Sequence, residues 1–149
     1  MAITQAMATS FKVEILTAYH NFGTTVTRAG TGADTFKIAL FTSAATLSAA
    51  TTTYSTTNEV SGTGYTAGGN TLTISQAPTS TSTTAWLDFA DSTWSAATIT
   101  ANGALIYNST QGDRAVAVLA FGGDKTSTAG DFTIIFPTAD STNDIIRIA

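Results

Sequence analysis

The sequence predicts a mainly β fold, an antiparallel β-sandwich or barrel-like domain of about seven to eight strands with one N-terminal amphipathic helix. Three observations predict this class. Apolar and polar residues alternate in short segments between residues 35 and 148, turn-forming residues separate these segments about every 8–12 residues, and helical spacing is limited to residues 3–22. The 149 residues suit a single domain (1–149), which we divide into an N-terminal helix and arm (1–23) and a β-rich body (35–149).

The N-terminal segment carries the helical pattern. Apolar residues recur there at spacings of three and four, and they are Ile3, Met7, Phe11, Ile15, Ala18 and Phe22. We expect a helix near residues 9–21 that ends before Gly23 and packs its apolar stripe on the core of its own domain. His20 would then lie in the last turn, where it complements the negative end of the helix dipole.

The body is predicted to consist of strands separated by turns. Alternation, or a short apolar run, marks strands at 35–42, 70–76, 84–90, 98–107, 114–121, 131–136 and 145–148. The connections hold turn-forming residues, with a glycine-rich system at 59–69, a loop at 78–83, a short turn at 91–93 and a hairpin at 108–113. Gly103 is expected to form a bulge, and Gly122 and Gly123 are expected to end the strand before them.

Residues 43–58 form a distinct segment before the glycine-rich turns. The segment consists almost only of Ser, Thr and Ala, with Leu47 and Tyr54 as its apolar members, and it contains no Gly or Pro. We therefore expect a folded arm rather than a flexible linker. A surface of Thr and Ser is polar without being charged, so it loses its water against a partner at less cost than a surface of Lys and Glu.

The arm shares its composition with the whole chain. Thr fills 32 positions and only 11% of the residues are charged, against about 25% in soluble domains. Thr is β-branched and its hydroxyl bonds readily to turn backbone, so this bias suits strands and turns. The composition therefore indicates a β scaffold with an uncharged polar surface.

Composition also excludes several classes of function. The chain has no cysteine and one histidine, which rules out disulfides, thiolate catalysis, Cys-ligated zinc and multi-histidine metal sites. Its net charge of −4, with only six basic residues, argues against an electrostatic grip on nucleic acid or on an anionic membrane. Residues 1–22 lack the order of a signal peptide, and no apolar run approaches the ~18 residues of a membrane span. We expect no cofactor, no metal, no nucleic acid and no membrane partner.

The residues that could carry catalysis do not form a recognisable constellation. Asp88 and Asp91 are a pair of carboxylates of the kind used in acid–base work or calcium binding, but a strand ending would point them in opposite directions. Asp124 and Asp131 flank a loop without the ligand spacing of an EF-hand. His20 is not accompanied by the Gly-x-Ser-x-Gly turn of serine hydrolases. We therefore expect no enzymatic activity and interpret the four acids as turn and strand-end residues.

Several stretches carry a resemblance to a known group of proteins. They are NEVSGTGYTAGGNTLT at 58–73, DFADSTWS at 88–95 with GALIYN at 103–108, FGGDKT at 121–126 with DFTIIFP at 131–137, and SFKVEIL at 10–16 with HNF at 20–22. With these stretches the whole chain resembles small virion proteins of tailed bacteriophages. Related-looking proteins of that group serve as capsid cement or decoration proteins.

The resemblance implies a function without catalytic residues. A decoration protein made in the host cytoplasm would bind the outside of the major capsid protein lattice as a homo-oligomer, a dimer or trimer, and stabilise the phage head. We expect the arm, and either the helix or the glycine-rich loop, to make the contact, with the candidate contact residues Leu47, Tyr54, Glu59, Tyr65, Phe11 and Ile15. The alternatives are a tail or fibre component that attaches to the host surface, a particle-borne glycan hydrolase that uses Asp88 and Asp91, and a host-derived adhesin-like module, which the missing signal-peptide pattern disfavours.

Overall fold

The structure is a computed structural model that describes residues 2–16, 19–23 and 32–148. Its elements in chain order are β1 (Ala6–Met7), α1 (Thr9–Leu16), β2 (Phe36–Phe41), β3 (Asn70–Thr71), β4 (Ile74–Thr81), β5 (Thr84–Phe89), β6 (Ser92–Asn108), β7 (Arg114–Ile134) and β8 (Ile146–Ile148). The strands form a sheet in the order β1-β7-β6-β2-β3 and a second sheet in the order β4-β5-β8, with antiparallel pairing throughout. The predicted fold class, mainly β with a short N-terminal helix, is confirmed.

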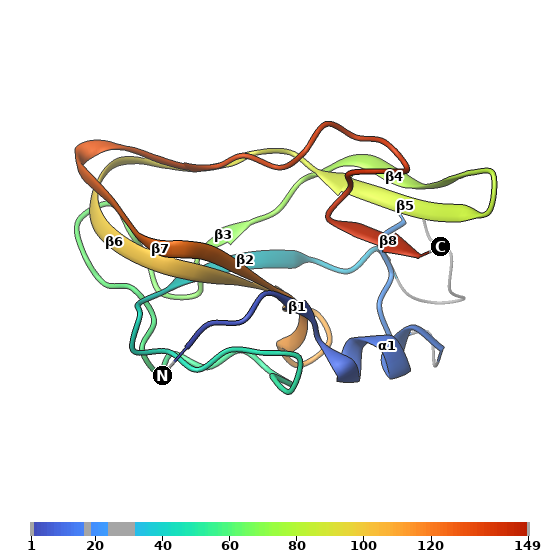
Figure 1. Cartoon of the computed structure of the whole chain (residues 1–149), viewed down its shortest axis with the longest axis horizontal. Helices are drawn as coiled ribbons and strands as arrows, with labels where there is room; N and C mark the ends of the chain where they lie inside the picture. The colour runs from blue at the N-terminus through green and yellow to red at the C-terminus, as the bar shows by residue number, and fades with distance from the viewer. Residues whose placement is uncertain (1, 17–18, 24–31, 149) are drawn as a thin grey trace.

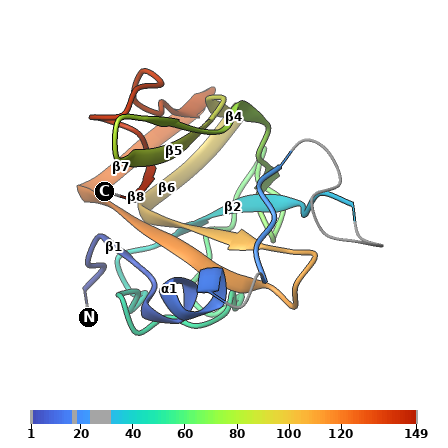
Figure 2. The same ribbon diagram turned by 90° about the vertical axis from the view of Figure 1, so that its right-hand side faces the viewer.

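The β6–β7 hairpin contains the two longest strands of the structure. The two strands pair from Asn108↔Arg114, beside the turn predicted at 108–113, to Ser92↔Ile134 at the open end. Figure 1 shows both strands curving back on themselves, so that their distal halves form a layer above their proximal halves. In the view turned by 90°, the same two strands cross the molecule diagonally, with β4, β5 and β8 on one side and α1 on the other (Figure 2).

Glycines allow the β6–β7 hairpin to bend. The register shifts between Ala101 and Gly103, which pair with Lys125 and Ala120, so the extra residues lie in β7 and the bulge expected at Gly103 is on the opposite strand. A Cβ on Gly103 would lie 2.6 Å from the backbone oxygen of Leu119, so no larger residue fits there. The prediction that Gly122 and Gly123 end a strand is wrong, because their positive φ values of 72° and 146° form an irregularity through which β7 continues.

The core lies on both sides of β2. Figure 1 shows the arm and α1 below β2 and the proximal halves of β6 and β7, and the distal halves of β6 and β7 above them. Residues of β2 are accordingly buried on both faces, with Ile38, Ala39 and Leu40 fully inaccessible. Phe11 of α1 is also fully buried, so the expectation that the helix packs on its own domain is confirmed.

The helix is shorter than the spacing predicted. It runs over Thr9–Leu16, and the described residues 19–23 are not helical. Phe22 instead stacks on Phe36 with ring centroids 4.1 Å apart, and the backbone N–H of Asn21 donates to Asp34 Oδ2 at 2.8 Å. These tertiary contacts outweigh the local preference for a helix, so the helix does not extend to Gly23. Ala18 lies outside the described residues.

Three other local predictions are wrong. The loop expected at 78–83 is mostly strand, because Pro78 lies in β4 at an irregularity between Gln76 and Thr79. Proline is tolerated there because β4 is an edge strand. The turn expected at 91–93 is the start of β6, and the strand expected at 70–76 is divided between β3 and β4, which belong to different sheets.

Candidate functional site

The arm, residues 43–58, folds against one face of the larger sheet. Ala45 and Leu47 are buried in the core, with exposed fractions of 2% and 8%. The arm backbone is held at both ends, because Thr4 N–H donates to the Leu47 carbonyl at 2.9 Å and Tyr54 N–H donates to the Asp113 carbonyl at 2.8 Å. The segment is therefore a folded part of the domain, as its composition predicted.

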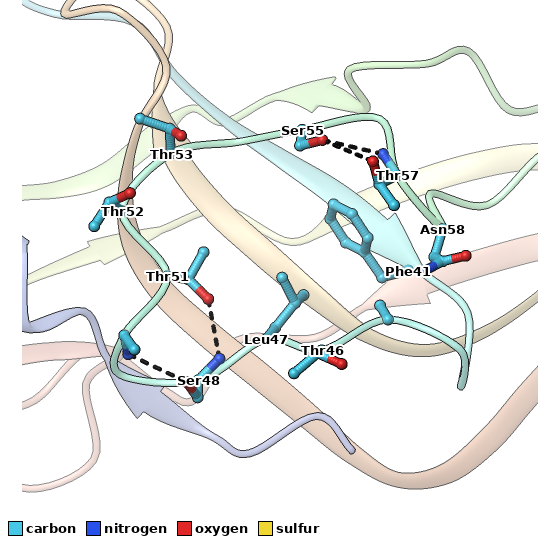
Figure 3. Close-up of a pocket in the computed structure, with 12 residues that line it drawn as sticks. Phe41, Thr46, Leu47, Ser48, Thr51, Thr52, Thr53, Ser55, Thr57 and Asn58 are labelled. Atoms are coloured by element: carbon cyan, nitrogen blue, oxygen red, sulfur yellow. Dashed lines mark hydrogen bonds between the residues drawn. The ribbon is translucent and has the colours of Figure 1, made fainter. Parts of the chain in front are cut away.

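The arm borders a hollow of about 510 Å³ that is open to solvent (Figure 3). Phe41, Ala45 and Leu47 line it but are almost fully buried, whereas Ala50 is exposed. Most of its remaining lining is hydroxyl-bearing, and consists of Thr46, Ser48, Thr51, Thr52, Thr53, Ser55 and Thr57, with Asn58 beside them. None of these side chains ionises in the physiological range. The hollow therefore offers mainly the hydroxyl and methyl groups of Thr and Ser side chains, without a charge.

Hydrogen bonds inside the arm hold the shape of the hollow. Ser48 N–H donates to Thr51 Oγ1 at 3.0 Å, and Ser48 Oγ accepts the N–H of Ala50 at 3.2 Å. On the opposite side, Ser55 Oγ donates to Thr57 Oγ1 at 3.1 Å (Figure 3). The side chains of this segment thus stabilise its own turns, so the hollow exists before any partner binds.

A carboxylate fastens the arm to the glycine-rich loop. The two oxygens of Glu59 accept hydrogen bonds from the hydroxyls of Tyr54 and Tyr65, each at 2.6 Å, and from Gly68 N–H at 2.7 Å. Burial, and then the hydrogen bond to Glu59, raise the pKa of both tyrosine hydroxyls, so they remain protonated donors. Tyr54 also stacks on Tyr107 with ring centroids 4.5 Å apart.

The glycine-rich loop approaches the sheet very closely at Gly69. This residue has a φ of +65°, and a Cβ on it would lie 1.9 Å from the backbone oxygen of Ile38. The glycine is therefore required by both conformation and space. The prediction of a turn system at 59–69 is confirmed, and the Glu59 contacts show how it is tied to the arm.

The six predicted contact residues do not form one surface. Tyr54, Glu59 and Tyr65 lie together, but their polar atoms bond to one another within the chain, and Leu47 lines the hollow. Phe11 is buried in the core and presents no surface. Ile15 contributes to a separate apolar hollow of about 150 Å³ between α1 and the sheet of β5 and β8.

His20 lies in a polar cluster that sequence reasoning missed. Its Nε2 is 2.7 Å from Glu14 Oε2, and its Nδ1 is 3.1 Å from Asn108 Nδ2. Asn108 Oδ1 accepts the N–H groups of Thr110 and Gln111, which fixes the orientation of the amide. Nδ1 must therefore accept, and Nε2–H donates to Glu14.

This cluster corrects the role expected for His20 at a helix end. Arg114 also donates to Glu14, so the cluster joins the N-terminal segment to the β6–β7 turn. Burial lowers the pKa of His20, although Glu14 pulls in the opposite direction. Glu14 and Arg114 are 100 positions apart in the sequence, and no local pattern connects them.

The carboxylates weighed as catalytic residues are engaged in structural contacts. Asp88 is buried and accepts the Ser75 hydroxyl at 2.9 Å, and Asp91 accepts the Phe136 N–H at 2.9 Å. Asp124 accepts the Asn102 side-chain amide at 2.8 Å. Over residues 2–16, 19–23 and 32–148, no three potential ligands among His, Cys, Asp and Glu are arranged to hold a metal ion. The helix that the structure describes is too short to cross a membrane.

Comparisons were made with protein-family models, with curated proteins and with solved structures. None of the three yields a match for this chain. The arm and its hollow are the feature on which a functional proposal can be built, because they combine a preformed surface with a distinctive, uncharged chemistry.

Proposed function

We propose that the chain is a non-enzymatic virion structural protein of a tailed bacteriophage, a decoration or cement protein that binds the outside of the major capsid protein lattice and stabilises the head. The observation that supports the proposal is the preformed, uncharged hollow of the arm. The resemblance in sequence names the partner, and the hollow supplies a surface with which such a partner can be bound.

The chemistry of the hollow suits a protein partner on a crowded shell. Ala50 and the methyl groups of exposed threonines provide apolar area, and its burial drives association at roughly 25 cal/mol per Å² before the costs of binding are subtracted. Thr and Ser hydroxyls lose their water at less cost than charged side chains do. Because the arm is already held by its own hydrogen bonds, little conformational entropy is lost when a partner binds.

A shell lattice would repeat this contact at many equivalent positions. Each copy would bury area across a joint between neighbouring shell subunits, and the joints would share the load of the packaged genome. A contact of moderate area is sufficient in such an arrangement, because stabilisation accumulates over the lattice rather than at one interface.

The proposal is tested by adding purified chain to expanded shells that lack it. After sedimentation, the ratio of the chain to the major capsid protein is measured on a gel, and the shells are heated. We expect a fixed ratio close to that of the lattice and an increase in the temperature at which the shells break open. A dozen or fewer copies, located at one vertex, would favour a tail or fibre component instead, and absence of binding would refute the proposal.

A further inference from the structure

A third hollow lies along the outer edge of β7. It has a volume of about 580 Å³, and its apolar lining includes Leu119, Phe121, Ile134, Ile135 and Ile145. Ile135 is 76% exposed, the highest value for a large hydrophobic side chain in the described residues. Apolar surface of this kind, rimmed by polar groups, marks an interaction site in soluble proteins.

The edge of β7 beside this hollow is open. Its partner β1 pairs only with Ala117 and Val118, and no named strand in the described part of the chain pairs with the outer side of β7 from Leu119 onwards. The positive φ values of Gly122, Gly123 and Ala129 interrupt the regular edge. Such irregularities prevent another strand from adding as a continuous ladder, so a partner would dock through side chains.

Two opposite charges line the hollow. Lys125 is exposed and forms no ion pair within the residues that the structure describes, and Asp131 uses one oxygen to accept the Ala96 N–H at 3.3 Å. Both side chains belong to β7 and line the same hollow. A purely acidic partner would attract Lys125 but repel Asp131, and a purely basic partner would do the reverse.

We propose that this hollow is the contact surface between two copies of the chain, related by a twofold axis that passes between Lys125 and Asp131. The axis brings the two β7 segments together in antiparallel directions. Lys125 of each copy then faces Asp131 of the other, which gives two equivalent ion pairs, while the apolar lining and Ile135 are covered. A surface that carries both signs of charge on either side of a midpoint is complementary to itself.

Sedimentation equilibrium of the purified chain tests this proposal without any shell. We expect a reversible monomer–dimer equilibrium for the wild type. In K125D two carboxylates face each other at both ion-pair positions of the dimer, and in D131K two lysines do. Each variant should raise the dissociation constant of the dimer at least roughly tenfold. The double variant K125D/D131K reverses both signs and should restore dimerisation to near the wild-type level.

The apolar part of the contact has a matched control. Ile135→Asp should abolish the dimer, whereas Ile148→Asp, at an exposed isoleucine of β8 outside this hollow, should leave it intact. Circular dichroism spectra and thermal unfolding confirm that each variant is folded. A wild type that stays monomeric or forms trimers, a double variant no better than the single ones, or equal effects at Ile135 and Ile148 would each overturn the proposal. Shell binding by the arm could still occur, so the two proposals fail separately.

Discussion

Replacing Glu59 by Ala should loosen the arm from the body of the domain. The carboxylate accepts three hydrogen bonds, from the Tyr54 and Tyr65 hydroxyls and from Gly68 N–H. A hydrogen bond to a charged group contributes roughly 1.5–3 kcal/mol to stability. Glu59 is half-buried and both tyrosines are partly accessible, so water recovers part of this loss. We therefore expect Glu59→Ala to lower the free energy of unfolding by about 3 kcal/mol.

Urea unfolding followed by tryptophan fluorescence measures this change. Trp94 is a suitable reporter, because it stacks on Tyr65 with ring centroids 5.9 Å apart. Tyr54→Phe removes one of the three hydrogen bonds and should cost about 1 kcal/mol. Thr83→Ala, at an exposed turn position, should change stability by less than about 0.5 kcal/mol. If Glu59→Ala is as harmless as Thr83→Ala, the carboxylate does not hold the arm and the reasoning is refuted.

Two further predictions concern His20 and Gly69. Burial lowers the pKa of His20 below 6.5, so the folded chain takes up a proton on His20 less readily than the unfolded chain does. The contribution of neutral His20 to stability should therefore be fully present above pH 6.5 and be lost as the pH is lowered through the folded-state pKa. Thermal unfolding measured against pH should show a smaller dependence of stability on pH for His20→Gln than for the wild type. Protonation would also turn Nδ1 into a second donor facing the Asn108 amide. Gly69→Ala should cost at least about 3 kcal/mol in urea unfolding because its Cβ meets backbone, whereas Gly112→Ala, with a φ of 68° and open space around it, should cost only about 1 kcal/mol; equal costs would contradict the close approach.

Local patterns in the sequence predicted the elements that depend on local chemistry. The alternation in β2 and β5 and the 108–113 turn follow from side-chain spacing and turn residues, and they are present. The end of α1 could not be predicted, because Phe22 leaves the helical path to stack on a residue of β2. Such contacts between distant residues have no signature in a single sequence.

The candidate site was predictable in composition but not in shape. An uncharged arm rich in Thr and Ser was evident from residues 43–58, whereas the hollow depends on the way the arm packs on Phe41. Tyr54 and Glu59 were singled out as contact residues, but their hydrogen bond inside the chain became visible only in three dimensions. The Glu14–His20 cluster was missed because its other partners come from the β6–β7 turn.

If the arm hollow binds a shell, a charge inserted at its rim should weaken that binding. Thr53 lines the hollow and is exposed, whereas Thr83 is exposed at the β4–β5 turn. The measurement is the occupancy of expanded shells, by sedimentation, for the wild type and for Asp and Lys variants at each position. Because a buried charge loses its water whatever its sign, both Thr53 variants should bind at least roughly tenfold more weakly, and both Thr83 variants should bind like the wild type. Full occupancy by both Thr53 variants, or no binding by the wild type, would contradict the proposed binding.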